Sequence, residues 1–93
     1  MLTAHNTIPS FMSGGKKDIT KELAYKDGKY SITLTDSNGV LSDYTFTSSD
    51  SSVTVSKSGN KLTITSEKAV SGSAVRIIRA KVYIINLIAN LLI

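Results

Sequence analysis

Apolar and polar residues alternate through the middle of this 93-residue chain, between residues 29 and 65. The alternation falls into four short segments, each preceded or followed by Gly, Asn, Asp or Ser. A period of two places successive apolar side chains on one face of an extended backbone, which is typical of a half-buried strand. The segments are KYSITLT (29–35), DYTFT (43–47), SVTVS (52–56) and KLTIT (61–65). The pattern therefore predicts an antiparallel β module.

An Asp-Gly pair at positions 27 and 28 predicts a tight hairpin. This turn would join a strand over ELAYK (22–26) to the strand over residues 29–35. The segment DITKELAYK (18–26) is also compatible with a helix that has Asp18 as its cap and Glu22 near its first turn. We favour the strand, because the Asp-Gly turn has to join two strands.

Clusters of Gly, Asn, Asp, Lys and Ser mark the other connections. Val40 and Leu41 are both apolar and so do not fit the alternation. We expect them to connect to the next strand through a bulge. Gly59 can adopt the positive φ that a hairpin turn requires. The last strand is expected to open with SAVRIIRAK (73–81). The predicted turns and loops are residues 36–39, 48–52, 57–60 and 67–73.

The two ends of the chain depart from this pattern. Residues 1–18 show no sustained period, and Pro9 and the Gly14-Gly15 pair favour an irregular arm with a flexible joint. Ile8 and Phe11 are apolar enough to dock this arm on a neighbouring sheet.

The C-terminal segment VYIINLIANLLI (82–93) is almost entirely apolar. It is too short for a membrane helix, which needs about 20 apolar residues. Three alternatives remain open: a helix or strand that covers the sheet, the first half of a truncated anchor, or a segment that does not belong to the domain. In a helix, Asn86 and Asn90 would share one side. An exposed apolar segment of this kind predicts self-association. The preceding cationic residues, which would suit a membrane-proximal position, are Arg76, Arg79 and Lys81.

We therefore predict an all-β fold: a small antiparallel sandwich or partly open barrel of about six strands. Residues 1–18 would be the irregular arm, residues 19–81 the β module and residues 82–93 the apolar tail. The predicted core is Leu23, Tyr25, Tyr30, Ile32, Leu34, Tyr44, Phe46, Val53, Val55, Leu62, Ile64, Val75 and Ile77.

Composition narrows the possible functions. The net charge is +4, but the Lys and Arg residues are dispersed and aromatic residues are few, so nucleic-acid binding is not expected. The absence of cysteine excludes disulfides, thiolate metal sites and thiol nucleophiles. Ser and Thr are frequent on the polar side of the alternating strands, which is typical of modules that function outside the cell but also of exposed sheets in general.

No residue pattern predicts catalysis, so we expect neither an enzyme nor a cofactor. His5 is the single histidine and has no partner at a useful spacing, and the serines lack a candidate base. Asp36 with Asn38, or Asp50 among serines, could supply oxygen ligands to calcium, but turn formation explains them without a metal. Residues 13–17 (SGGKK) lack most of a phosphate-binding loop.

Residues 7–78 resemble part of the thioester-domain surface proteins of Gram-positive bacteria, notably their clostridial forms. The most specific segments are TIPSF, YSITLTDSNGVLSDYTFTSS and VSKSGNKLTITS. A looser resemblance, through FTSSDSSVTVS and Gly72, is to the group 2 bacterial immunoglobulin-like domains. The thioester family forms a Cys–Gln crosslink, and this chain contains neither residue type. From about Arg79 onward it also departs from the family pattern.

The resemblance implies a non-catalytic β module, a fragment of a cell-surface adhesin that supports attachment to a host surface or matrix component. It also implies an extracellular location on the bacterial surface, although this chain shows neither a secretory signal nor an anchor. Related surface modules carry Lys–Asn isopeptide bonds, but Lys61 and Asn60 would face opposite sides of a strand, with Glu22 as the candidate acid. The alternative function is a self-associating structural module, which would form homo-oligomers through residues 82–93 or through an exposed strand edge.

Overall fold

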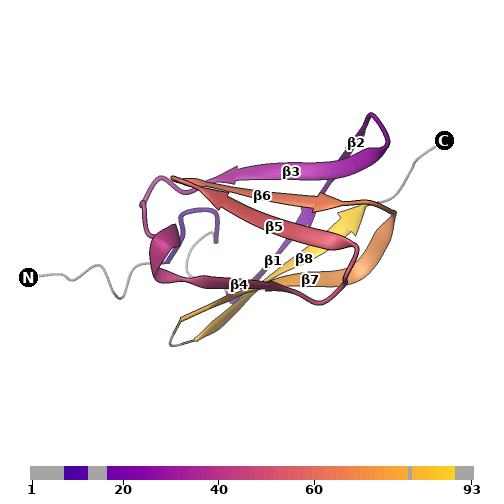
Figure 1. Cartoon of the computed structure of the whole chain (residues 1–93). Helices are drawn as coiled ribbons and strands as arrows, with labels where there is room; N and C mark the ends of the chain where they lie inside the picture. The colour runs from indigo at the N-terminus through magenta and orange to yellow at the C-terminus, as the bar shows by residue number, and fades with distance from the viewer. Residues whose placement is uncertain (1–7, 13–16, 80, 90–93) are drawn as a thin grey trace, which may run out of the picture.

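The alternating segments form strands that stack as two sheets (Figure 1). The structure is a computed structural model, and it describes residues 8–12, 17–79 and 81–89. The chain is all-β, as predicted, and its one short 3₁₀ turn in these ranges is η3, Leu41–Asp43. The strands are β1 (Asp18–Glu22), β2 (Ala24–Lys26), β3 (Lys29–Thr35), β4 (Thr45–Ser48), β5 (Val53–Ser58), β6 (Lys61–Ser66), β7 (Val70–Ile78) and β8 (Val82–Ala89).

Each sheet has four strands. Sheet A has the order β1-β8-β7-β4, and sheet B has the order β2-β3-β6-β5. Neighbouring strands are antiparallel except β1 and β8, which are parallel. Of the two predicted architectures, the sandwich and the partly open barrel, the structure shows the sandwich, because its two sheets do not close into a barrel. It has eight strands in the described ranges where about six were expected.

The chain changes sheets at Leu23, between β1 and β2. The Leu23 side chain is buried, and its backbone N–H donates to the carbonyl of Ile88 in β8 at 2.8 Å. The segment expected to begin the first hairpin is therefore two strands in two sheets, because β1 pairs with β8 and β2 pairs with β3. The helix alternative for residues 18–26 is wrong.

The predicted Asp-Gly hairpin is confirmed. Lys26 pairs with Lys29, so Asp27 and Gly28 form a two-residue loop between β2 and β3. Both loop residues have positive φ, 54° for Asp27 and 85° for Gly28. Two successive positive φ values are the signature of a type I′ turn, whose twist matches that of the flanking strands. The predicted hairpin between β5 and β6 also forms, with Gly59 at φ 57°.

Two connections differ from the prediction. Val40 and Leu41 do carry the chain from β3 to β4, but they do so through η3, with both side chains buried. Strand β7 begins at Val70, three residues before the expected Ser73. Gly72, with φ 85°, lies at an irregularity in the pairing of β7 with β8, so the glycine marks a bulge inside a strand.

The apolar C-terminal segment supplies strand β8 over Val82–Ala89. Of the three alternatives, the structure therefore shows a strand, and it lies inside sheet A between β1 and β7 instead of over a sheet. Residues 90–93, including Asn90, lie outside the described ranges. No helix in the described ranges has the length and hydropathy needed to cross a membrane.

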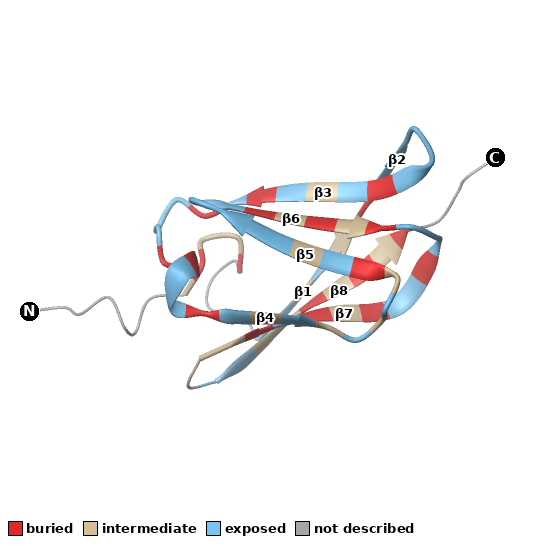
Figure 2. Cartoon of the chain, in the orientation of Figure 1, coloured by how far each residue is buried: buried red, intermediate tan, exposed pale blue. Residues whose placement is uncertain are grey.

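Most of the predicted core is confirmed (Figure 2). Ile32, Phe46 and Val55 are partly buried and pack against it. The prediction that Tyr25 is in the core is wrong. Tyr25 is 50% exposed, because it lies in β2, a three-residue strand at the edge of sheet B. The predicted residues that are buried are Leu23, Tyr30, Leu34, Tyr44, Val53, Leu62, Ile64, Val75 and Ile77.

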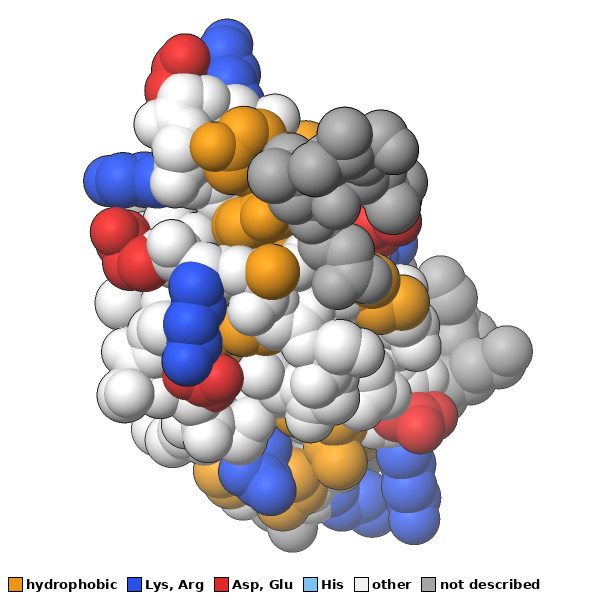
Figure 3. Space-filling view, turned by 90° about the vertical axis from the view of Figure 1, so that its right-hand side faces the viewer, with side chains coloured by type: hydrophobic (Ala, Val, Ile, Leu, Met, Phe, Trp, Pro, Cys, Tyr) orange, Lys and Arg blue, Asp and Glu red, His pale blue; other side chains and the backbone are white. Residues whose placement is uncertain are grey.

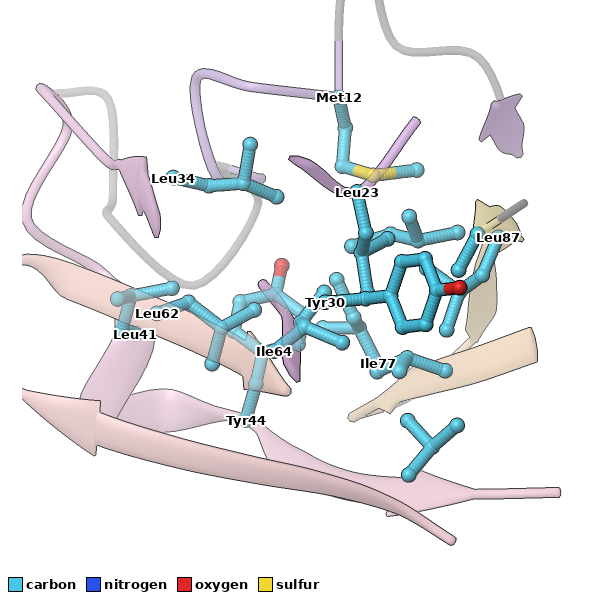
Figure 4. Packing of buried hydrophobic residues seen from close by; sticks show 14 of the residues in the cluster. Met12, Leu23, Tyr30, Leu34, Leu41, Tyr44, Leu62, Ile64, Ile77 and Leu87 are labelled. Atoms are coloured by element: carbon cyan, nitrogen blue, oxygen red, sulfur yellow. The ribbon is translucent and has the colours of Figure 1, made fainter. Parts of the chain in front are cut away.

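The sequence pattern missed a second group of core residues. Met12, from the N-terminal arm, is fully buried and lies beside Leu23 (Figure 4). Ile8 and Phe11 pack against the core, as expected of a docked arm. The other missed apolar residues are Val40, Leu41, Val70, Ile85, Leu87 and Ala89.

Candidate binding surfaces

The outward side of sheet B is covered by hydroxyl side chains. The strand registers align them in ranks across β3, β6 and β5, and the hydroxyl oxygens of Thr33 and Thr63 lie 3.3 Å apart. We call this surface the hydroxyl face. Its members are Ser31, Thr65 and Thr54 in one rank, Thr33, Thr63 and Ser56 in the next, and Thr35 and Ser58 on either side of Lys61 in the third.

A hollow of about 590 Å³ opens at one end of the hydroxyl face, beside the β2–β3 turn. Lys29 in this hollow lies 3.9 Å from the carboxylate of Glu67, and both side chains are more than 60% exposed, so this ion pair is weak. The lining residues are Lys26, Asp27, Lys29, Ser31, Thr63 and Thr65. Ammonium and hydroxyl groups together can bind an anionic, hydroxyl-rich ligand.

Asp36 is a buried carboxylate at the opposite end of sheet B, and its side chain is fully enclosed. Its two oxygens accept three backbone N–H groups, from Ser10 (2.8 Å), Asn38 (2.9 Å) and Val40 (2.7 Å). The Asn38 side chain donates to the carbonyl of Ile8 at 2.9 Å. The carboxylate thus holds the N-terminal arm against the turn after β3.

Asp50 organises the serine-rich loop between β4 and β5. Its Oδ1 atom accepts from both the backbone N–H (2.9 Å) and the hydroxyl (2.7 Å) of Ser52, and its Oδ2 atom accepts from Ser73 in β7 (3.3 Å). The hydrogen bonds from Ser52 lower the pKa of Asp50 below its ordinary value, because they stabilise the ionised form.

The residues considered for catalysis or metal binding are not brought together. Asp36 and Asp50 lie at different loops, and no group of three or more His, Asp or Glu residues that could hold a metal occurs in the described ranges. Glu22 lies in sheet A, whereas Lys61 lies in sheet B, beside the β5–β6 turn, so the isopeptide arrangement is not formed. His5 and residues 13–16 of the SGGKK segment lie outside the described ranges.

The side chains of Tyr44, Tyr83 and Arg79 meet at the end of the sandwich that carries the β7–β8 turn. The guanidinium of Arg79 lies 5.9 Å from the ring centre of Tyr44, and the rings of Tyr44 and Tyr83 meet edge to face at 6.4 Å. Burial raises the pKa of the Tyr44 hydroxyl, and a hydrogen bond donated by the Arg79 side chain opposes that shift. This contact closes the end of the core near the β7–β8 turn.

The outward side of sheet A differs from the hydroxyl face, because its central strand is apolar. Ile84 and Ile88 of β8 alternate with the buried Ile85 and Leu87, so they lie on the opposite side of the sheet and are partly exposed. The sequence signal for this surface was the loss of alternation over Val82–Ala89, which indicates a strand apolar on both faces.

No protein-family model matches this chain, and comparisons with curated proteins and with solved structures find no match.

Proposed function

We propose that the chain is a non-catalytic β-sandwich module of a Gram-positive cell-surface adhesin, similar to the β portion of the thioester-domain proteins. Its role is to support attachment to a host surface or matrix component. The resemblance of residues 7–78 motivates the proposal, and the strand order is the structural observation that supports it.

Strands β2 to β8, taken in chain order as A to G, are arranged as A-B-E-D in sheet B and G-F-C in sheet A. This is the order of constant-type immunoglobulin sandwiches. It supports the looser resemblance to bacterial immunoglobulin-like domains, which are used in adhesins.

The placement of the described ends also suits a module in a longer protein. The arm at residues 8–12 lies beside the turn after β3, whereas β8 ends at the opposite end of the sandwich (Figure 1). Entry at one end and exit at the other allows sandwiches to be joined in series.

Surface location is tested on the organism that encodes the chain. Antibodies raised against the folded module should label intact cells, and brief protease treatment of those cells should remove the signal. Labelling that appears only after permeabilisation would overturn the proposal.

The hollow beside the β2–β3 turn suggests an anionic glycan as the ligand class. The double variant Lys26→Gln/Lys29→Gln should weaken binding to an immobilised sulfated polysaccharide about tenfold or more, because it removes both ammonium groups of the hollow. The matched variant Lys57→Gln/Lys61→Gln removes the same charge at the other end of sheet B and should have a smaller effect. Equal losses of binding in the two double variants would show that net charge alone causes the binding. A failure of the original chain to bind the polysaccharide would exclude this ligand class.

Self-association through residues 82–93 is a second proposal for the same chain. It is favoured by the partly exposed isoleucines of β8, which leave an apolar strip at the centre of the outer side of sheet A.

A further inference from the structure

Strand β8 carries apolar side chains on both faces. Its inward residues Ile85, Leu87 and Ala89 are each no more than 1% exposed, and its outward residues Ile84 and Ile88 are partly exposed. A central strand with this composition is typical of a sheet that is covered on both sides. In the described ranges, no strand or helix covers the outer side of sheet A.

The neighbours of β8 give this outer side a defined charge pattern. Register places Ile84 between Asp18 of β1 and Arg76 of β7, so an acid and a base flank the same isoleucine at one strand spacing, about 4.8 Å, on either side. We call this surface the β8 outer face. Its members are Asp18, Thr20 and Glu22 of β1, Ile84, Asn86 and Ile88 of β8, and Ala74 and Arg76 of β7.

This pattern is complementary to itself under a two-fold rotation about an axis along β8. The rotation brings Ile84 opposite Ile84 of a second copy and exchanges the two sides of the strand. Asp18 then faces Arg76 of the second copy, and Arg76 faces its Asp18. Self-complementarity of this kind is what an isologous interface requires.

We propose that two copies of the chain pack face to face through the β8 outer face, with the two-fold axis along β8. The inference rests on the proposed self-association and names the surface and symmetry that produce it. Apolar contact between the isoleucines excludes water, and the two Asp18–Arg76 pairs select the orientation. Asn86 lies on the axis, and its side chain donates to the carbonyl of Ile19 at 3.3 Å in its own chain.

Figure 3 shows the molecule end-on, with hydrophobic, Lys and Arg side chains at the surface along its lower edge, on the side of sheet A. The available area is modest. Strand rise and spacing give the three strands that carry the β8 outer face an area of about 350 Å², which is less than the roughly 800 Å² per partner of a standard interface. The dimer is therefore expected to be weak and to dissociate on dilution.

Sedimentation of the full chain over a wide concentration range tests the proposal. The original chain should pass from monomer to dimer, whereas Ile84→Glu should remain a monomer at every concentration. Thr33→Glu places the same charge on the hydroxyl face of sheet B and should dimerise like the original chain. Circular dichroism and thermal melting of each variant establish that it is folded.

A charge exchange tests the orientation without relying on Ile84. Asp18→Arg and Arg76→Asp, each alone, should weaken dimerisation several-fold, and the double variant should restore it, because it re-forms both pairs with their signs reversed. Both positions are exposed, so folding should be retained.

These experiments test self-association separately from the surface and symmetry that are proposed for it. An original chain that stays monomeric at all concentrations would overturn self-association itself. A dimer that persists in Ile84→Glu would place self-association on another surface, and a double variant that fails to restore the dimer would overturn the two-fold arrangement.

Discussion

The backbone N–H of Ser10 donates to the Oδ1 atom of Asp36 at 2.8 Å, across 26 positions of sequence. Because the same carboxylate accepts the N–H groups of Asn38 and Val40, it joins the N-terminal arm to the connection between the sheets. Met12, two residues after Ser10, is fully buried in the core. Asp36 is therefore a structural residue whose hydrogen bonds position the arm.

Asp36→Ala should lower the free energy of unfolding by about 3–5 kcal/mol, because three backbone donors lose their buried acceptor. For a domain of this size, that loss corresponds to a fall in Tm of more than about 10 °C. Thermal denaturation measures it. Asp43→Ala removes an exposed carboxylate from η3 and should change the stability by about 0.5 kcal/mol or less. Equal effects at the two positions would contradict the role of Asp36.

Gly28→Ala should destabilise the fold by about 1–2 kcal/mol. The cost is in the backbone: Gly28 has φ 85°, and a Cβ atom there would meet nothing within 4 Å. Asp27→Asn is the matched control and should be nearly neutral, because Asn-Gly favours the same type I′ turn. Urea denaturation compares the two variants. A neutral Gly28→Ala would show that the turn relaxes to another type at little cost.

Ser52→Ala should raise the pKa of Asp50 toward its ordinary value of 3.8, because Ser52 supplies the largest stabilisation of the ionised form. Titration of the Asp50 carboxyl carbon by NMR measures the change. Ser51→Ala, in the same loop, is the control. In that variant the pKa of Asp50 should stay as low as in the original chain. An unchanged pKa in Ser52→Ala would assign the shift to other contacts.

The lowered pKa also predicts a pH dependence of stability. Asp50 binds its proton more weakly in the folded chain than in the unfolded one, so ionised Asp50 stabilises the fold above pH 3.8. This contribution is lost as the pH falls through the lowered folded value. The difference in Tm between the original chain and Asp50→Asn should therefore be larger near pH 6 than in acid well below pH 3.8. A constant difference would contradict the linkage.

A chain that ends at Lys81 should be unfolded, because it lacks β8, the strand between β1 and β7. Circular dichroism and thermal melting test this. A soluble truncated chain with a cooperative transition would show that the remaining strands close the sandwich without β8.

Single substitutions in β8 should distinguish its two faces. Leu87→Ala should cost about 2–5 kcal/mol, since Leu87 is 1% exposed in the core. Ile88→Ala, on the outer side, should cost about 1 kcal/mol or less at concentrations where the chain is monomeric. Similar costs at both positions would mean that the outer side is also closely packed within one chain.

The alternation of residues predicted which side chains point inward, and local turn chemistry predicted the hairpins. Tyr30, Val53 and Ile64 are buried as expected, since a period of two is a property of the extended backbone itself. The Asp27-Gly28 turn was predictable for the same reason, because its φ values depend on the two residues in it.

Whether a side chain is buried depends on more than the side of the strand to which it points. Tyr25 pairs with the buried Tyr30 and its ring lies 4.9 Å from that ring, yet it is half exposed at the edge of sheet B. Alternation says which way a side chain points and not whether another element covers it. The buried carboxylate of Asp36 was also unpredictable, because its donor Ser10 is distant in sequence.

The sequence by itself determined an all-β chain, the approximate positions of its central strands and which of their side chains point inward, because these follow from the geometry of a few neighbouring residues. Only the tertiary structure decided that β1 and β2 belong to different sheets and that β8 lies at the centre of sheet A. Strand partners are chosen by contacts between segments that are far apart in the chain, such as the pairing of Ile19 with Ile85. Such pairings require loop closure and the burial of whole faces, which no local pattern encodes.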